Sequence, residues 1–340
     1  MIRIDSIKLK ASADTIIEHN NAYRYKPEYS SETGELITEK KLWSNPAFGI
    51  KSLSIDTIDN SVVVEASAKV LKNNYFDMIN INTVEQLVGA INDTSAIKLN
   101  ADKFINEANV LRCDTTQNLY TDKPLAYYFT NLANLPLQDK YEIEHYKRAS
   151  NKGIVYKGGQ KTFKERFIGY DKLAELLKGK GKKEIIDNLP PAVLKQFQNI
   201  LRVETNFTQL ERIKEHCKTN DTKLISILQS NAIPTLNVFN KITKKVDVDL
   251  QLFKPFEGMR YSDIEKLIGR QNICKALGYD MGAIRAYIEM YVKGNISRYL
   301  IAYKKLCLEL LAEAEVEESD KVILMRPKII TEMQELMKAA

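Results

Sequence analysis

Two segments that lie far apart in the chain share one residue pattern. Residues 110–116 read VLRCDTT and residues 200–206 read ILRVETN, so both place Leu, Arg, an acidic residue and Thr or Asn in register. Apolar and polar side chains alternate in each segment, which is typical of a strand with one buried face. Two such strands, each exposing an arginine and a carboxylate two residues apart, are expected to build one polar face of a sheet. The fold is therefore constrained to one organised around a β-sheet with charge on one side.

Predicted strands and helices alternate through the first part of the chain. The segment SVVVEASAKVL, residues 61–71, has strand periodicity and precedes an amphipathic helix that begins near residue 82. Another helix, with Pro124 in its first turn, follows the strand at residues 109–118. Beyond about residue 220 the pattern is helical, and three of these helices with short turns resemble a helix-turn-helix, although most such triplets are simple bundles. We expect a sheet-bearing domain over residues 1–220 and a helical domain over residues 221–340.

Composition places the chain among soluble globular proteins. Of its 340 residues, 44% are hydrophobic and 28% charged, which is enough to bury the cores of two domains. No run of about 18 apolar residues is present, and the first residues alternate like a strand instead of forming a signal peptide. We therefore expect a cytoplasmic protein without a membrane span. The four cysteines lie far apart in sequence and are expected to be reduced core residues.

Positive charge is concentrated in the middle of the chain. Between residues 147 and 224 there are 18 Lys and Arg residues against nine Asp and Glu, whereas the whole chain carries only +6. Such an excess is often a solvated face, but a local basic field also suits an anionic polymer such as DNA. The segment KGKGKK, residues 178–183, is interpreted as a basic clamp for the DNA backbone.

The basic region surrounds one candidate nucleophile, Tyr170. It lies in KTFKERFIGYDKLAELLK, residues 161–178, where a predicted strand over residues 162–169 gives way to a predicted helix. A tyrosine at such a junction can be held by the sheet while its hydroxyl faces solvent, an arrangement that covalent phosphoryl transfer requires. The alternative is that Tyr170 is one of 17 tyrosines and only caps a core.

Other catalytic chemistries have little support in the sequence. The chain has three histidines, none near another, and neither a P-loop nor a G-x-G-x-x-G motif. The remaining candidates are Glu65, Asp114 and Glu204, which lie mid-strand on the less apolar faces. Carboxylate oxygens of this kind bind Mg²⁺ or Mn²⁺. Taken singly, each acid could instead form a surface salt bridge, for example Glu204 with Arg112.

Four motifs occur in an order that resembles a known family. VEASAKVLKNN, VLRCDTT, RFIGYDKLAEL and ILRVETN resemble the gene II/X replication initiators of filamentous phages and their phage and plasmid relatives, within the rolling-circle initiator nuclease superfamily. The resemblance covers roughly residues 1–220. It implies an α+β fold in which helices pack on one face of a mainly antiparallel sheet, followed by a helical C-terminal domain that adds DNA affinity.

The resemblance also implies roles for individual residues. Tyr170 would cleave DNA, and Lys172 would neutralise the phosphate or lower the pKa of the tyrosine. Lys172 would share the face of Tyr170 if the strand continues to residue 172, and would lie nearly opposite if a helix has begun. Asp114 and Glu204 would be metal or structural acids, with Glu65 a less secure ligand for Mg²⁺ or Mn²⁺.

Two features depart from the family pattern or leave an alternative open. The His-hydrophobe-His metal motif of the superfamily is absent, so carboxylates must replace it. Tyr156, in VYKGG, is an alternative nucleophile, since some plasmid initiators have a tyrosine before a glycine in this region. The residues predicted to contact DNA are Arg112, Arg166, Lys180, Lys182, Lys183 and Arg202.

The implied activity is nicking of one strand at a replication origin. Tyr170 would form a 5′-phosphotyrosyl linkage, release a 3′-hydroxyl that primes rolling-circle synthesis, and later rejoin the strand. A mobilisation relaxase with the same chemistry is an alternative, as is a DNA-binding regulator or capsid-associated protein that kept the fold without the nuclease. The expected partners are single-stranded or supercoiled origin DNA and the helicase and polymerase of a bacterial host cell, in whose cytoplasm the protein would act, without a membrane.

Overall fold

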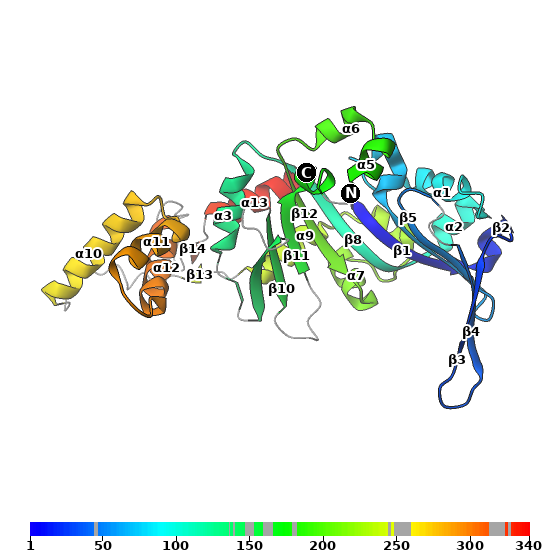
Figure 1. Cartoon of the computed structure of the whole chain (residues 1–340), viewed down its shortest axis with the longest axis horizontal. Coiled ribbons are helices and arrows are strands. Elements are labelled where there is room, and N and C mark those ends of the chain that lie inside the picture. Colours follow the sequence, from blue (N-terminus) through cyan, green and yellow to red (C-terminus); the bar gives the residue numbers. More distant parts are fainter. Residues whose placement is uncertain are drawn as a thin grey trace.

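One large sheet organises the chain (Figure 1). The computed structural model describes residues 1–43, 47–135, 137–138, 140–146, 153–158, 166–178, 182–243, 246–247, 260–312, 324–325 and 328–340. The strand order in the sheet is β3-β4-β5-β6-β1-β8-β12-β11-β10-β9, and every neighbouring pair is antiparallel. The strands are β1 (Ile4–Ser12), β3 (Arg24–Tyr29), β4 (Leu36–Trp43), β5 (Ile50–Asp56), β6 (Ser61–Ser67), β8 (Asn109–Tyr120), β9 (Tyr141–His145), β10 (Gly153–Gly158), β11 (Arg166–Asp171) and β12 (Ile200–Phe207). The predicted α+β class with a mainly antiparallel sheet is confirmed.

The two segments that share a sequence pattern are direct neighbours in this sheet. Asn118 of β8 lies opposite Arg202 of β12, and Thr116 lies opposite Glu204. Because side chains alternate along a strand, Leu201 and Val203 point to the other side, where both are fully buried. The polar face predicted from the repeated pattern therefore exists, and β11 extends it.

The apolar face of the sheet is covered by helices. Phe167 of β11 contacts Phe239 of α9 (Pro234–Ile242) at 5.2 Å between ring centroids, and Phe207 of β12 stacks on His216 of α7 (Leu210–Cys217) at 5.1 Å. Gln117 of β8 donates a hydrogen bond to the carbonyl of Met337 in α13 (Lys328–Ala339). The helices α1 (Val84–Asn92), α2 (Ala101–Glu107), α3 (Leu125–Ala133) and α8 (Leu224–Gln229) also belong to this unit.

Short elements lie over part of the polar face. They are η2 (Ala68–Asn74), α4 (Lys172–Leu176), α5 (Lys182–Asn188) and α6 (Pro191–Gln196). Tyr75, directly after η2, and Phe197, directly after α6, pack against each other with ring centroids 5.4 Å apart. Both rings are buried above the sheet, so this part of the polar face is shielded from water.

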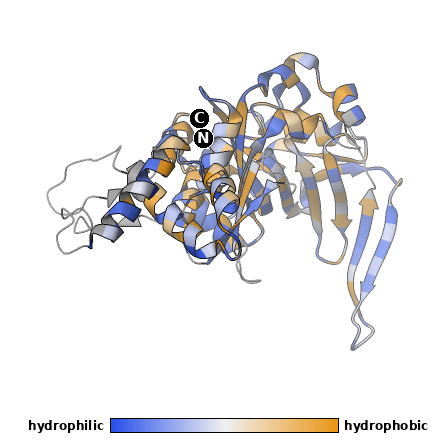
Figure 2. Cartoon of the chain, turned by 60° about the vertical axis from the view of Figure 1, so that its left-hand side comes forward, coloured by the Kyte–Doolittle hydropathy of each residue, from blue (hydrophilic) through white to orange (hydrophobic). Residues whose placement is uncertain are grey.

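A long hairpin projects from the sheet at its β3 edge (Figures 1 and 2). It consists of β3 and β4, and its outer part exposes Tyr25, Tyr29 and Ile37. A second, two-stranded sheet pairs β2 (Ile16–His19) with β7 (Ile97–Leu99), and a third pairs β13 (Val246–Asp247) with β14 (Leu324–Met325). The main hydrophobic core therefore packs on the ten-stranded sheet, and the two small sheets are additional strand pairs.

The C-terminal third contains a separate helical core. It is formed by α10 (Tyr261–Ala276), α11 (Met281–Tyr291) and α12 (Ser297–Ala312), whose buried side chains include Cys274, Ile284 and Cys307. Helices α8, α9 and α13 belong instead to the core of the large sheet. Figure 1 shows α13 beside the sheet and the two termini close together, where Arg3 donates a hydrogen bond to the carbonyl of Ala340 at 2.6 Å.

The boundary at residue 220 expected from the sequence stays a prediction, and the contacts of α8, α9 and α13 with the core of the large sheet suggest a different division. We propose that this unit extends to residue 243 and includes α13, and that α10 to α12 form the second unit. None of the described helices combines the length and the apolar character that crossing a bilayer requires.

Candidate functional site

The candidate site lies where β11 ends on the polar face of the sheet. Tyr170 pairs with Arg202 of β12, so their side chains share that face. The strand stops at Asp171, whose carboxylate accepts a hydrogen bond from the backbone N–H of Ala174 and so caps α4. A strand that turns into a helix at this point holds Tyr170 on the sheet and delivers Lys172 from the first helical turn.

The hydroxyl of Tyr170 is held between a carboxylate and an ammonium group. It donates a hydrogen bond to Glu204 Oε1 at 2.5 Å and accepts one from Lys172 Nζ at 3.3 Å. The ring of Tyr146 stacks on the ring of Tyr170, with centroids 4.6 Å apart and planes 18° apart. Tyr170 is therefore only 2% exposed, and the expectation that its hydroxyl faces solvent is wrong, because Tyr146 covers it. Burial, with the nearby Glu204 charge, raises the pKa of Tyr170 well above its usual value near 10.

Lys172 reaches the phenol although the helix has already begun. We expected a helical start to put Lys172 nearly opposite Tyr170, and this is wrong because its long side chain turns back across the junction. Its ammonium group also contacts Glu175 at 3.1 Å and Asp5 at 3.9 Å. Burial lowers the pKa of Lys172, but Asp5, Tyr170 and Tyr75 together outweigh it and raise that pKa well above its usual value. Lys172 therefore stays cationic beside the phenol oxygen.

Arg202 is the fully buried cation of the site. It is completely buried, with its guanidinium over the rings of Tyr75 and Phe197 at 5.6 and 5.1 Å from their centroids. Its Nη1 donates to Asp5 Oδ1 at 3.1 Å and its Nε to Asn118 Oδ1 at 2.9 Å. These aromatic rings and hydrogen bonds enclose Arg202, and its predicted contact with DNA stays a prediction.

Asp5 is a site residue that the sequence reasoning missed. The pairing of β1 with β8 shifts between Ile4 and Ser6, so Asp5 is the extra residue of a β-bulge, and a bulge re-aims a side chain. Burial would raise the pKa of Asp5, but Lys172 and Arg202 outweigh it and lower that pKa to about 2. A signal was present: apolar residues recur at Ile4 and then Ile7, which breaks the period of two.

Glu204 has the protonation behaviour of a general base. Burial raises its pKa to about 7, and the charge of the nearby Asp5 carboxylate adds to this. A carboxylate with that pKa is mostly ionised just above neutral pH and still basic enough to take a proton. A carboxylate with a raised pKa and an ammonium group therefore both contact one oxygen atom, the hydroxyl of Tyr170.

The three acids predicted as metal ligands lie on the same face of the sheet, and each of them contacts a basic side chain. Arg112 lies 3.9 Å from both Glu65 and Asp114, and Arg202 lies 3.9 Å from Glu204. Among the described residues, no three His, Cys, Asp or Glu side chains converge as metal ligands do. The described residues therefore form no set of three converging metal ligands, and Mg²⁺ or Mn²⁺ stays a prediction. The suggested salt bridge of Arg112 with Glu204 is replaced by its contacts with Glu65 and Asp114.

The alternative nucleophile, Tyr156, belongs to the opposite face of the sheet. It pairs with Phe167, is fully buried, and donates its hydroxyl to the carbonyl of Leu132 at 2.6 Å. Burial raises its pKa well above the usual value. No carboxylate or ammonium contact to its hydroxyl is present in the described part of the chain, so nothing here would activate it.

Three of the other residues predicted to contact DNA have described side chains. Arg166 at the start of β11, Lys183 in α5 and Arg112 in β8 are accessible to solvent, Arg112 with 43% of its side chain exposed. Lys180 lies outside the described residues. Lys182 begins α5, where only its backbone is described.

Comparison with solved structures finds a distant likeness. No model of a known protein family matches this sequence, and no curated protein matches it. A solved structure to which the chain is similar is the rolling-circle replication initiator protein from Geobacillus stearothermophilus, with 9% sequence identity and a TM-score of 0.33. The match covers 76% of this chain and 91% of that chain. A likeness this distant carries no inference about activity, so the function has to come from the site.

Proposed function

We propose that this protein initiates rolling-circle replication by nicking one DNA strand with Tyr170 as the nucleophile. The observation that carries the proposal is the contact of a single phenol oxygen with Glu204 Oε1 at 2.5 Å and Lys172 Nζ at 3.3 Å. A nucleophile within hydrogen-bonding reach of a base, with a cation at the same atom, is the arrangement that covalent catalysis uses. The basic character of residues 147–224 makes a phosphodiester a suitable substrate.

The proposed reaction moves two protons and exchanges one ester for another. Glu204 takes the proton of the Tyr170 hydroxyl as the phenol oxygen attacks phosphorus, and the bond from phosphorus to the 3′-oxygen breaks. The departing 3′-oxygen takes a proton from water, which leaves hydroxide, and the 5′-phosphate stays on Tyr170. In the reverse direction a 3′-hydroxyl gives its proton to hydroxide as it attacks the phosphotyrosine, and Glu204 returns its proton to the departing phenol oxygen. Lys172 stabilises the negative charge that develops on the phenol oxygen and phosphate.

Two features of the site support a phosphate as its ligand. Among the described residues, Arg202 Nη2 is buried without a hydrogen-bond partner, so one guanidinium donor is left for a further acceptor. Arg166 and Lys183 are exposed near the same face and would hold the backbone of the strand. For the scissile phosphate to reach Tyr170, the ring of Tyr146 has to move off it, and a nucleobase could replace that stacking contact.

In the proposed reaction, no step involves a metal ion. Mg²⁺ or Mn²⁺ was predicted from the sequence, but the positive charge at the phenol in this structure comes from Lys172 and Arg202. Parallel reactions with either ion and with a chelator test the metal requirement separately from the identity of the nucleophile.

Peptide mapping is expected to find the covalent linkage on Tyr170. The protein is incubated with supercoiled and single-stranded origin-containing DNA, the adduct is trimmed with nuclease, and tryptic peptides are analysed by mass spectrometry. The added nucleotide should be on residues 167–172, FIGYDK, because the Tyr170 hydroxyl contacts both Glu204 and Lys172. A linkage on residues 153–157, GIVYK, would transfer the role to Tyr156. If no adduct forms with any candidate origin or ion, the nicking proposal fails. The protein would then be a DNA-binding regulator or a capsid-associated protein without nuclease activity.

Replacement of Glu204 is expected to slow adduct formation and remove its pH dependence. Because the carboxylate form is the base, the rate in the unaltered protein should rise with pH and level off above about 7, following the pKa of Glu204. Glu204→Gln should lower the rate about 10²- to 10⁴-fold and leave it flat across this range. Glu144→Gln is the control, since this exposed glutamate of β9 pairs with Lys157 away from the phenol. An unchanged pH profile in Glu204→Gln would exclude Glu204 as the base.

A mobilisation relaxase would use the same chemistry, so the site does not separate it from a replication initiator. The distinction is one of partners: an initiator would work with a host helicase and polymerase on a replicating circle. Replication of an origin-bearing plasmid in cells that supply this protein tests the initiator role directly.

A further inference from the structure

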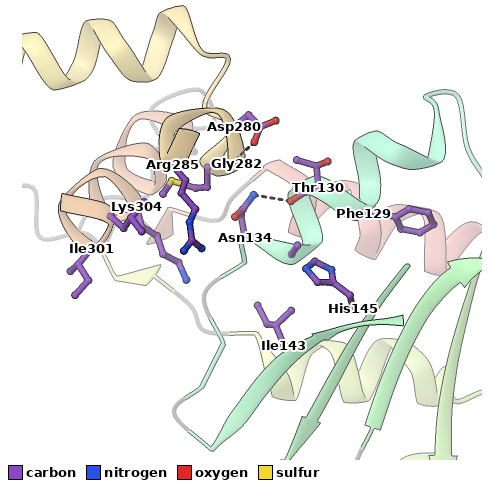
Figure 3. A pocket seen from close by; sticks show the side chains of 13 residues that line it. Phe129, Thr130, Asn134, Ile143, His145, Asp280, Gly282, Arg285, Ile301 and Lys304 are labelled. Carbon is purple, nitrogen blue, oxygen red and sulfur yellow. Dashed lines mark hydrogen bonds between the residues drawn. The ribbon is translucent and has the colours of Figure 1, made fainter. Parts of the chain in front are cut away.

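A cavity of about 620 Å³ lies between the sheet-bearing unit and the helical unit. On one side it is lined by α3 and the edge strand β9, and on the other by α11 and α12 (Figure 3). Its volume is in the range of small-ligand sites, which are typically about 300–1,000 Å³. None of the residues assigned above to nicking lines this cavity.

Basic groups from three different elements meet in the cavity. Figure 3 shows Arg285 of α11 and Lys304 of α12 extending toward the wall that carries His145 of β9. The carboxylate among the lining residues, Asp280, is engaged in capping α11, where it accepts hydrogen bonds from the backbone of Gly282 and Ala283. Arg285 also forms an exposed ion pair with Glu289 at 3.0 Å, whereas Lys304 adds a second positive charge to the cavity. A bound anion would balance the positive charge that these two side chains bring together.

The same space also has apolar walls. Ile143 of β9 lies on one side, and Ile301, which is 71% exposed, lies one helical turn from Lys304 on the other. An isolated phosphate ion would leave these side chains uncovered, and an apolar peptide would supply no negative charge for Lys304 and Arg285. A nucleotide has both a charged phosphate and an apolar base face, so it complements both kinds of wall.

The edge strand connects this cavity to Tyr170. His145 pairs with Ile154 and lines the cavity, whereas the next residue, Tyr146, points to the other face and stacks on Tyr170. Because β9 is the last strand of the sheet, nothing in the described sheet continues beyond it. A DNA single strand bound at Tyr170 could pass around the β9 edge of the sheet and enter the cavity.

We propose that this cavity binds a nucleotide of the same single strand whose phosphodiester Tyr170 attacks, with Arg285 and Lys304 on its phosphate and Ile143 and Ile301 against its base. The inference rests on the proposed nicking function and adds a second contact region for the substrate strand, on the far side of β9.

The test measures strand binding without cleavage. In a Tyr170→Phe background, the double variant Arg285→Glu/Lys304→Glu is compared with Lys293→Glu/Arg298→Glu, which makes the same charge change at exposed positions outside the cavity. Anisotropy of a fluorescein-labelled single-stranded oligonucleotide gives the affinity. We expect the cavity variant to bind at least about tenfold more weakly, with a salt slope shallower by about 1.4 for two lost phosphate contacts. The control should keep most of its affinity.

A milder variant tests whether a loss of affinity could come from misfolding. Lys304→Gln removes one charge at an exposed helical position and should reduce the salt slope by about 0.7. Equal losses in the cavity and control variants, or no loss in either cavity variant, would overturn the proposal. Binding of dATP that is lost in the cavity variant while oligonucleotide affinity is unchanged would also overturn it, by assigning the cavity to a free nucleotide. If the cavity variants lose affinity but the unaltered protein forms no adduct, the nicking function fails while the cavity remains a strand-binding site.

Discussion

Replacing Tyr170 with phenylalanine is expected to abolish the covalent protein–DNA adduct while leaving the protein folded. The substitution removes only the hydroxyl that would attack phosphorus and keeps the ring that stacks on Tyr146. It also leaves Glu204 without its 2.5 Å donor, which should cost about 1–3 kcal/mol in the free energy of unfolding. The adduct is measured on denaturing gels with labelled origin DNA, and the unfolding free energy by urea denaturation.

The chain offers a matched control in Tyr156→Phe. Tyr156 is also buried in the sheet, and its hydroxyl also donates one short hydrogen bond, at 2.6 Å to the carbonyl of Leu132. Its loss should destabilise the protein by a similar amount without affecting the adduct. If Tyr170→Phe retains the adduct and Tyr156→Phe loses it, the nucleophile has been assigned to the wrong face of the sheet.

Replacing Arg202 with methionine is expected to cause a large loss of stability. Its guanidinium is fully buried and neutralises the mostly buried Asp5 at 3.1 Å, so its removal leaves that carboxylate with the more distant ammonium group of Lys172 as its next contact, at 3.9 Å. Breaking a buried ion pair from one side typically costs about 3–5 kcal/mol, because the remaining charge is uncompensated. Urea denaturation should report this loss as a lower midpoint.

Arg112→Met is the control for Arg202→Met. Arg112 lies in the neighbouring strand with 43% of its side chain exposed and touches its acids only at 3.9 Å, so its loss should cost less than about 1 kcal/mol. The double variant Asp5→Asn/Arg202→Met should lose less than the sum of the two single variants, since the two side chains interact directly. Additive losses, or equal losses in Arg202→Met and Arg112→Met, would contradict the buried-pair account.

Much of the sheet could be predicted because strand periodicity is a local property. The strand predicted for ILRVETNF is β12, and the strand predicted from residue 109 is β8. Their alternation correctly placed Arg202 and Glu204 on the side opposite Leu201 and Val203. The sequence reasoning was wrong about exposure, since nothing local to Tyr170 shows that Tyr146 covers it. It also missed that α13, close to the chain end in sequence, packs on the central strand β8.

From the sequence alone, it was determined which side chains share a face of each strand, because successive residues of an extended chain point in opposite directions. Only the tertiary structure decided which strands are neighbours and in what register, because pairing joins segments that are distant in the chain. That pairing brings Glu204 of β12 to the hydroxyl of Tyr170 in β11, and the bulge in β1 turns Asp5 toward Arg202 and Lys172. The faces therefore follow from local geometry, whereas the chemistry of the site follows from long-range packing.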